Sequence, residues 1–263
     1  MPLTLKPLTD IPLWDIPSEI LAFVAGAFFI AGIVKGLTGL GLPAMSLGLL
    51  LLTLELRDAM VILVIPLFAT NVWQGLTGGH LRATLMRLWP LFVTGVIGIW
   101  LAVGVMVAAN PAILAIMLGV ILAGYAAYSL STPQMKAFGR WEIILSPLAG
   151  AITGVIGGLT GSMAVPSVPY MQALGMKRDA LIQAMGVWFC LGSLALGGAL
   201  GGRGALPVDL AIVSAGAVIP AIIGMNVGRR LRQRLSEERF RKVFFTALIL
   251  LGLYIAGRGT FQL

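Results

Sequence analysis

The chain has 263 residues, of which 59% are hydrophobic and 11% charged, and its mean hydropathy is +0.99. Soluble domains carry about 25% charged residues, so this composition excludes a soluble enzyme and a disordered protein. The net charge of +8 does not indicate nucleic-acid binding, because seven of the 18 Lys and Arg residues lie between Arg229 and Lys242, in a loop between two apolar stretches. Cytoplasmic loops of membrane proteins are rich in these residues.

Long uncharged stretches predict an all-α membrane protein. A membrane-spanning helix needs about 20 apolar residues, and in lipid each backbone amide must bond within its own helix. After an interfacial lead-in at 1–17, we expect ten helical segments, at 18–36, 43–55, 59–79, 84–108, 111–131, 141–157, 164–174, 179–200, 207–228 and 239–257. The second and seventh segments are too short to cross a hydrocarbon core of about 30 Å as straight helices.

The two halves of the chain repeat the same motifs in the same order. Gly32-x-x-x-Gly36-Leu37-Thr38-Gly39 returns as Gly154-x-x-x-Gly158-Leu159-Thr160-Gly161, and a proline follows each, Pro43 and Pro166. Further matches pair Arg57-Asp58-Ala59 with Arg178-Asp179-Ala180, Arg82 with Arg203, and Gly95 with Gly216, all at offsets of 121 to 123 residues. The sequence therefore predicts two transmembrane repeats, 18–131 and 141–258, joined by a cytoplasmic linker at 132–140.

The distribution of Lys and Arg predicts how the repeats are oriented. If all ten segments cross the membrane, 14 of these residues lie on one side and 4 on the other, whereas the ratio is 11 to 7 if the two short segments turn back. The excess of positive charge in cytoplasmic loops favours ten crossings with both termini outside. Five crossings in each repeat would give the second repeat an inverted topology.

Two glycine-rich breaks, 36–41 and 157–162, each precede a short segment. Irregular backbone in a membrane is tolerated only where it is buried in protein or lines a cavity, and exposed amides at a helix N-terminus attract anions. Paired breaks in two halves indicate a transporter site near the midplane. Gly-x-x-x-Gly also lets helices pack closely, so both roles are open. The predicted substrate-binding residues here are Thr38, Gly39, Gly41, Thr160, Gly161 and Ser162.

Other polar residues extend this candidate site. Lys35 either supplies charge to the anion or reaches for the cytoplasmic interface. Polar amides inside spans should face the bundle interior, where they either bind an oxyanion or link helices; they are Asn71, Gln74 and Gln183. Arg82 and Arg203 follow matched Gly-x-x-x-Gly motifs and are either entry residues for anions or ordinary interface arginines.

Enzymatic and metal chemistry find little support in the sequence. His80 is the single histidine, and H-E-x-x-H, G-x-S-x-G and P-loop motifs are missing. All ten Asp and Glu residues lie in the lead-in or near segment ends, so no mid-membrane carboxylate is evident for coupling to a proton or to sodium. We therefore expect neither enzyme activity nor a cofactor or metal, and an uncharged interior with glycine breaks suits an anion better than a cation.

The stretches Gly36-Leu37-Thr38-Gly39-Leu40-Gly41-Leu42-Pro43 and Gly157-Gly158-Leu159-Thr160-Gly161-Ser162-Met163-Ala164-Val165-Pro166, with the duplicated layout, resemble the sulfite exporter (TauE/SafE) family of bacterial inner-membrane proteins. The resemblance implies a secondary transporter in the inner membrane that exports sulfite or organosulfonates by alternating access. The implied partners are the small anion and the lipid bilayer, without nucleic acid, and a homodimer is also open. A passive anion channel and a transporter of another small organic anion remain alternatives.

Overall fold

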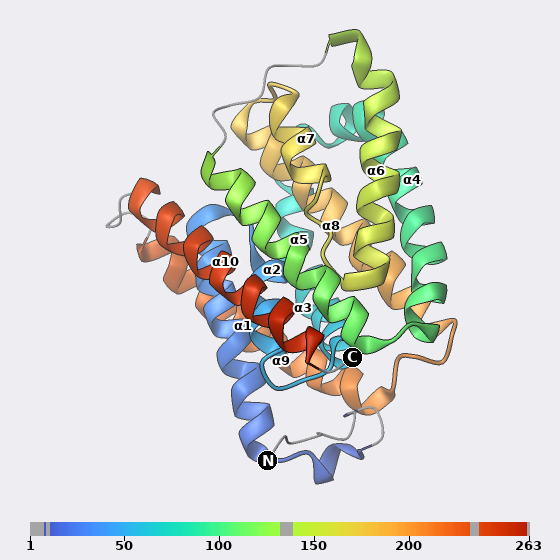
Figure 1. Ribbon diagram of the computed structural model, residues 1–263. Helices are drawn as coiled ribbons and strands as arrows, with labels where there is room; N and C mark the ends of the chain where they lie inside the picture. Colours follow the sequence, from blue (N-terminus) through green and yellow to red (C-terminus); the bar gives the residue numbers. More distant parts are fainter. Residues whose placement is uncertain (1–7, 9–10, 132–138, 232–236, 262–263) are drawn as a thin grey trace. The chain divides into compact units, whose positions relative to one another are not determined.

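The computed structural model describes residues 8, 11–131, 139–231 and 237–261 (Figure 1). Within this part of the chain there are ten α-helices and no strand, and each predicted segment corresponds to one helix. The helices are α1 (Ser18–Thr38), α2 (Leu42–Leu50), α3 (Leu56–Leu76), α4 (Leu81–Ala108), α5 (Pro111–Ser131), α6 (Glu142–Thr160), α7 (Ser167–Ala173), α8 (Arg178–Gly201), α9 (Val208–Leu231) and α10 (Glu237–Thr260). Most of the predicted lead-in, most of the linker and residues 232–236 of the basic loop lie outside the described residues.

Eight helices in the described chain are long and apolar enough to cross a membrane. The other two are α2, with 9 residues, and α7, with 7 residues. The all-α membrane class predicted from composition is thus confirmed for the described residues. The number of crossings and the inverted topology of the second repeat stay predictions.

Proline and its neighbours shape several helices. Pro111 is the first residue of α5, where its missing N–H costs nothing, and the Asn110 Oδ1 accepts the N–H of Ala112 at 2.9 Å as a cap. Pro66 lies inside α3, where a proline frees the carbonyl four residues earlier. The Ser214 hydroxyl of α9 donates to that carbonyl, Ile62 O, at 2.8 Å.

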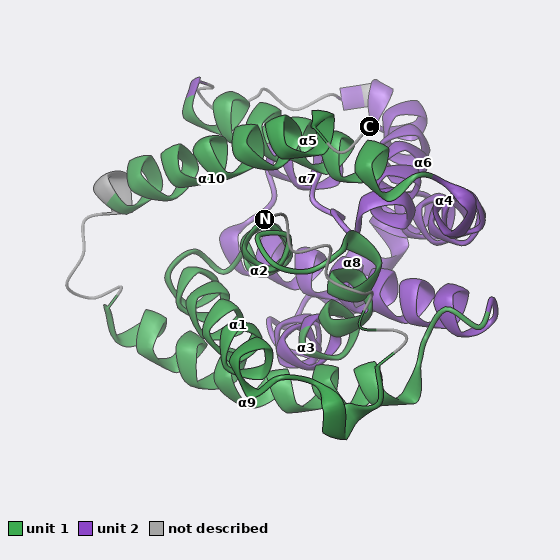
Figure 2. Ribbon diagram, turned by 60° about the horizontal axis from the view of Figure 1, so that its bottom comes forward, with its two compact units in different colours: residues 1–66, 110–130, 204–263 green, residues 67–109, 131–203 purple. Residues whose placement is uncertain are grey.

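The chain divides into two compact units, coloured in Figure 2. Unit 1 comprises residues 1–66, 110–130 and 204–263, and unit 2 comprises residues 67–109 and 131–203. The boundary at 66/67 falls inside α3, so this helix contributes to both. The units do not coincide with the predicted repeats, because unit 1 combines α1 and α2 with α9 and α10 from the other half of the sequence.

In unit 1, α1 and α9 pack through glycines on both helices. A Cβ at Gly32 would collide with the carbonyl of Ala221, and one at Gly36 with the carbonyl of Met225. From the other side, a Cβ at Gly224 would collide with the carbonyl of Phe29. The backbones therefore touch directly, as small residues allow in membrane helices.

In unit 2, α4 and α6 pack in the same way. A Cβ at Gly154 would collide with the carbonyl of Gly95, and one at Gly158 would lie 2.7 Å from the Ile99 oxygen. A Cβ at Gly98 would lie 2.9 Å from the carbonyl oxygen of Ala151. The packing role predicted for the Gly-x-x-x-Gly motifs is therefore found in each unit.

Candidate functional site

The break in unit 1 is a short connection between α1 and α2. Helix α1 ends at Thr38, and Gly39, with φ 80°, donates its N–H to the Lys35 carbonyl at 2.7 Å. Gly41, with φ 90°, precedes α2, whose second residue is Pro43. Only glycine adopts such left-handed conformations without strain, so two glycines within three residues end one helix and start the next.

The Thr38 hydroxyl closes this connection. Its oxygen accepts the N–H of Leu40 at 3.1 Å, and it lies 2.9 Å from the Val34 carbonyl and 2.8 Å from the Leu40 carbonyl. The hydroxyl hydrogen is therefore used by the chain's own backbone. Thr38 thus shapes the turn. In the first turn of α2, Pro43 has no N–H and the Met45 N–H donates to the Gly41 carbonyl at 2.9 Å, so the amides that precede the helix's own hydrogen bonds are those of Leu42 and Ala44.

Lys35 lies in the last turn of α1 and is buried, with 4% of its surface exposed. A cation near the C-terminal end of a helix is favourable because the helix dipole is negative there. Lys35 therefore brings a positive charge into the interior of the protein, within one helical turn of Gly39. The two roles predicted for Lys35, supply of charge to an anion and a side chain reaching for the interface, stay predictions.

In unit 2, α6 ends at Thr160, and Gly161 adopts φ 75°. The Thr160 hydroxyl donates to the Ile156 carbonyl at 2.7 Å and accepts the N–H of Ser162 at 3.3 Å. This repeats the arrangement at Thr38, but here Thr160 is completely buried and Ser162 is 3% exposed, whereas Thr38 is exposed. The helix ends of the two motifs thus share their hydrogen bonding and differ in burial.

Two residues that the sequence did not single out hold the stretch between α6 and α7. The fully buried Trp188 of α8 donates its indole N–H to the Met163 carbonyl at 2.7 Å. The Thr153 hydroxyl of α6 accepts the N–H of Ser167 at 2.9 Å. A tryptophan within an apolar segment is itself a signal, because a buried indole N–H needs an acceptor, but the acceptor could not be named from the sequence.

The candidate amides act as links between α3 and α8 in unit 2. Gln74 donates to the Ile182 carbonyl at 3.0 Å, and Gln183, completely buried, donates to the Gly75 carbonyl at 3.0 Å. The Gln183 oxygen also accepts the N–H of His80 at 2.8 Å. Asn71 is buried and donates to Leu67 O within α3. Asn71 and Gln183 are buried and Gln74 is half-buried; of the two roles left open, the helix-linking one is visible for Gln74 and Gln183.

The two matched arginines have different surroundings. Arg82 is exposed in the first turn of α4. Arg203 is also exposed, but it donates to the carbonyls of Trp100 at 2.7 Å and Ala199 at 3.1 Å, and its guanidinium carbon lies 5.9 Å from the Trp100 ring centroid. Arg203 thus tethers the end of α8 to α4 within unit 2. The entry role assigned to both arginines stays a prediction.

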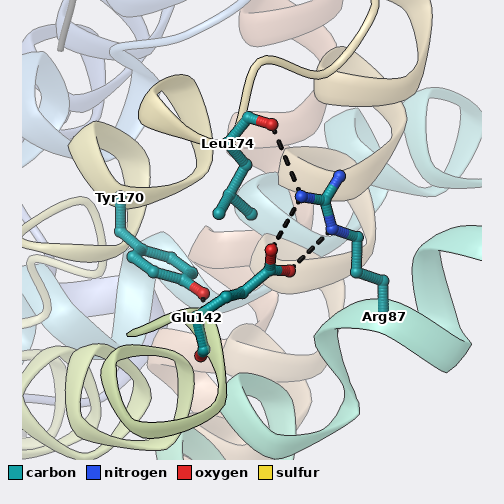
Figure 3. Close-up of polar contacts among 4 residues, drawn as sticks. All are labelled: Arg87, Glu142, Tyr170 and Leu174. Atoms are coloured by element: carbon teal, nitrogen blue, oxygen red, sulfur yellow. Dashed lines mark hydrogen bonds and ion pairs between the residues drawn. The ribbon is translucent and has the colours of Figure 1, made fainter. Parts of the chain in front are cut away.

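A second arginine contact in unit 2 was not expected from the sequence. Arg87 of α4 forms a bidentate ion pair with Glu142 of α6, at 2.6 Å and 2.8 Å, and donates to the carbonyl of Leu174 just after α7 at 3.4 Å (Figure 3). The Tyr170 hydroxyl donates to the Glu142 carbonyl at 3.5 Å. Opposite charges next to two spans were the available signal, but their pairing depends on the packing of α4 against α6.

Taken unit by unit, the predicted site residues form a buried lysine beside a glycine turn in unit 1, and a buried glycine turn and a set of amide links in unit 2. Among the described residues, no group of three or more His, Cys, Asp and Glu side chains is placed to hold a metal ion.

These features define a multi-pass α-helical membrane protein with glycine-capped helix ends in each compact unit. The sequence model of the sulfite exporter TauE/SafE family matches residues 24–255, which is most of the chain, and the chain belongs to this family. The resemblance noted in the glycine motifs is confirmed. Neither the curated proteins nor the solved structures gave a match. The family is one of transporters, and its description names sulfite export.

Proposed function

We propose that this protein is a secondary transporter that exports small sulfur oxyanions, sulfite or organosulfonates, across the bacterial inner membrane. The observation that carries the proposal is the pair of Gly-Leu-Thr-Gly helix ends, at Gly39 and Gly161, in a membrane chain of the TauE/SafE family. Glycine backbone at membrane depth suits close approach of an anion to amide groups.

The proposed mechanism is alternating access, in which one repeat moves against the other around the two breaks. In unit 1, the first amides of α2 and the buried charge of Lys35 supply attraction for an anion. In unit 2, Gly161 and Ser162 supply backbone groups next to Thr160, whose hydroxyl fixes their conformation. The electrical driving force favours export of a negative charge from a negative interior, by about 2.3 kcal/mol per charge per 100 mV.

The test is sulfite flux through purified protein in liposomes. A transporter gives a rate that saturates with sulfite concentration, and it accelerates when sulfite is present on the opposite side. A passive channel gives neither saturation nor this counterflow. Competition by organosulfonates and by unrelated organic anions then defines the substrate class, and no flux of any of these anions would refute the proposal.

Lys35→Gln tests the buried charge within the same assay. The variant keeps a long polar side chain while removing the positive charge, so a contribution to anion attraction predicts a higher KM for sulfite. Arg230→Gln is the matched control, because Arg230 is an exposed cation in the last turn of α9 in the same unit. Equal KM values for the two variants would remove Lys35 from the proposed site.

A further inference from the structure

The C-terminal end of α7 is held by an arginine of another helix. Arg87 donates to the Leu174 carbonyl, and Glu142 fixes the guanidinium through two parallel hydrogen bonds (Figure 3). A bidentate guanidinium–carboxylate pair has a defined geometry, unlike a pair made by a lysine. The contact therefore ties α7 to α4 and α6 at one point.

The stretch that leads into α7 is tied at its other end. Trp188 donates to Met163 O, and Thr153 accepts the Ser167 N–H. Because α7 has only 7 residues, its own hydrogen bonds resist displacement weakly. Its position in unit 2 depends on these external contacts at both ends.

The corresponding end of α2 in unit 1 also receives an arginine. Arg258 donates to the carbonyls of Leu51, at 3.1 Å, and Leu52, at 2.8 Å, just after α2. Leu52 and Leu174 are 122 residues apart, the offset of the repeated motifs. Arg258 lies in the last turn of α10, whereas Arg87 lies in α4, so the two arginines are not counterparts in the duplication.

What the two units share is thus a guanidinium that donates to the carbonyls after the short helix, although the arginine comes from a different position in each repeat. The last carbonyls of a helix lack partners within the helix, and its C-terminal end attracts cations. Two different helices supply a guanidinium to the same place on the two short helices, each within its own unit. A general need for surface charge would not select this place twice.

We propose that Arg87 and Arg258 are positioning residues for transport. Each holds the C-terminal end of a short helix, α7 or α2, and thereby fixes the break that precedes it, 161–166 or 39–41. The inference rests on the proposed function, because it takes the breaks as the place where the anion binds. In unit 2, Glu142 holds the guanidinium of Arg87 in place, so Glu142 also takes part in positioning α7. In unit 1, Arg258 donates to the two carbonyls after α2.

The first test measures sulfite flux for Arg87→Gln, Arg87→Lys and the control Lys177→Gln, which removes an exposed cation of the same unit. Displacement of the break predicts a KM raised about tenfold for Arg87→Gln, which corresponds to about 1.4 kcal/mol, and an unchanged KM for the control. Arg87→Lys should fall between, since one ammonium cannot reproduce the fork of donors. A role in stability alone would lower the maximal rate, through loss of active protein, at constant KM.

The second test does not depend on the substrate. Amide hydrogen exchange in 161–174 should rise in Arg87→Gln and should stay unchanged in Lys177→Gln. Glu142→Gln should also raise it, and this milder variant serves as the test if Arg87→Gln does not fold. Arg258→Gln should raise exchange in 39–52, with Arg230→Gln as its control. Unchanged KM and unchanged exchange in the arginine variants would overturn this inference. Absence of sulfite flux in the wild-type protein would refute the proposed function instead, and the exchange data would still show whether the anchors exist.

Discussion

At the residue scale, the glycines that end α1 and α6 are set by backbone conformation. Gly39 adopts φ 80° and a Cβ there would meet no described atom within 4 Å. A side chain at Gly39 would therefore be strained by its dihedral angle alone. The sequence could predict these helix ends, because a glycine after the last helical residue, with a proline a few residues on, ends a helix by local rules.

Gly39→Ala should destabilise the protein by about 1–2 kcal/mol, the cost of a left-handed conformation for a residue with a Cβ. Gly26→Ala is the matched control, because Gly26 lies in the same helix, also faces open space and has an ordinary helical φ. It should be neutral or stabilising by up to about 1 kcal/mol. Unfolding in detergent, followed by circular dichroism, measures both, and equal stability of the two variants would contradict the argument.

Trp188→Phe keeps a large aromatic side chain beside Phe92, with which Trp188 is stacked, but removes the donor to Met163 O. The Met163 carbonyl still accepts the Ser167 hydroxyl at 3.0 Å, so the variant loses one of two hydrogen bonds, which should cost about 0.5–1.5 kcal/mol. Trp89→Phe is the control, because Trp89 is 60% exposed, and it should change stability by less than about 0.5 kcal/mol. The same unfolding measurement decides, and a Trp188→Phe variant as stable as the control would show that the bond is dispensable.

At the element scale, the close approach of α1 to α9 and of α4 to α6 could be predicted only as a tendency. Gly-x-x-x-Gly indicates that a helix packs closely, but the partner of Gly32 lies in the other half of the sequence, at Ala221. The match between Gly95 and Gly216 was misleading for the contacts. Gly95 packs against Gly154, while a Cβ at Gly216 would meet no described atom within 4 Å. Gly154 approaches Gly95, and its counterpart Gly32 approaches Ala221, so the residue of α9 that takes the place of Gly95 is five residues after Gly216.

Two glycines of α9 differ in what surrounds them, and substitutions at these two positions should therefore have opposite outcomes. Gly228→Leu would force a side chain into the carbonyl of Ile33 on α1, and overpacking of this kind costs about 1–3 kcal/mol or more. Gly216→Leu adds the same volume on the same helix where it meets open space, and should be tolerated. Fluorescence-detected size-exclusion chromatography after heating reports the loss of folded protein. Comparable losses for both variants would mean that α1 and α9 do not pack as described.

At the scale of the whole molecule, the positions of the helices follow from the local sequence, whereas their grouping into compact units depends on contacts between distant parts of the chain. The helices and the membrane class follow from composition. All ten helices of the described chain begin within three residues of the predicted segments, and nine of them also end within three; the exception is α2, which ends at Leu50 where the segment was expected to reach 55. The compact unit to which each helix belongs does not follow from composition, because α9 and α10 form one unit with α1 and α2 from the other half of the sequence. Backbone contacts between distant glycines decide that grouping, and no local pattern encodes the partner.

The number of crossings is testable from the two short helices. Helix α2 has 9 residues and is about 14 Å long at 1.5 Å per residue, so a crossing there needs the non-helical residues on either side as well. The ratio of positive charges nevertheless favours ten crossings. Ten crossings place Thr77, between α3 and α4, in the cytoplasm and Ala109, between α4 and α5, outside. Eight crossings, with α2 and α7 turning back, exchange these two positions.

Single cysteines in a Cys190→Ser background separate the two cases, because Cys190 is the protein's one cysteine. We expect an impermeant thiol reagent added to intact cells to label Ala109→Cys, and to label Thr77→Cys only after the membrane is permeabilised. Ala205→Cys, between α8 and α9, is the internal standard, because both arrangements place it outside. The reverse labelling of Thr77 and Ala109, with Ala205 still accessible, would show that the short helices re-enter without crossing. The two repeats would then run in the same direction, and the proposed movement of one inverted repeat against the other would have to be abandoned.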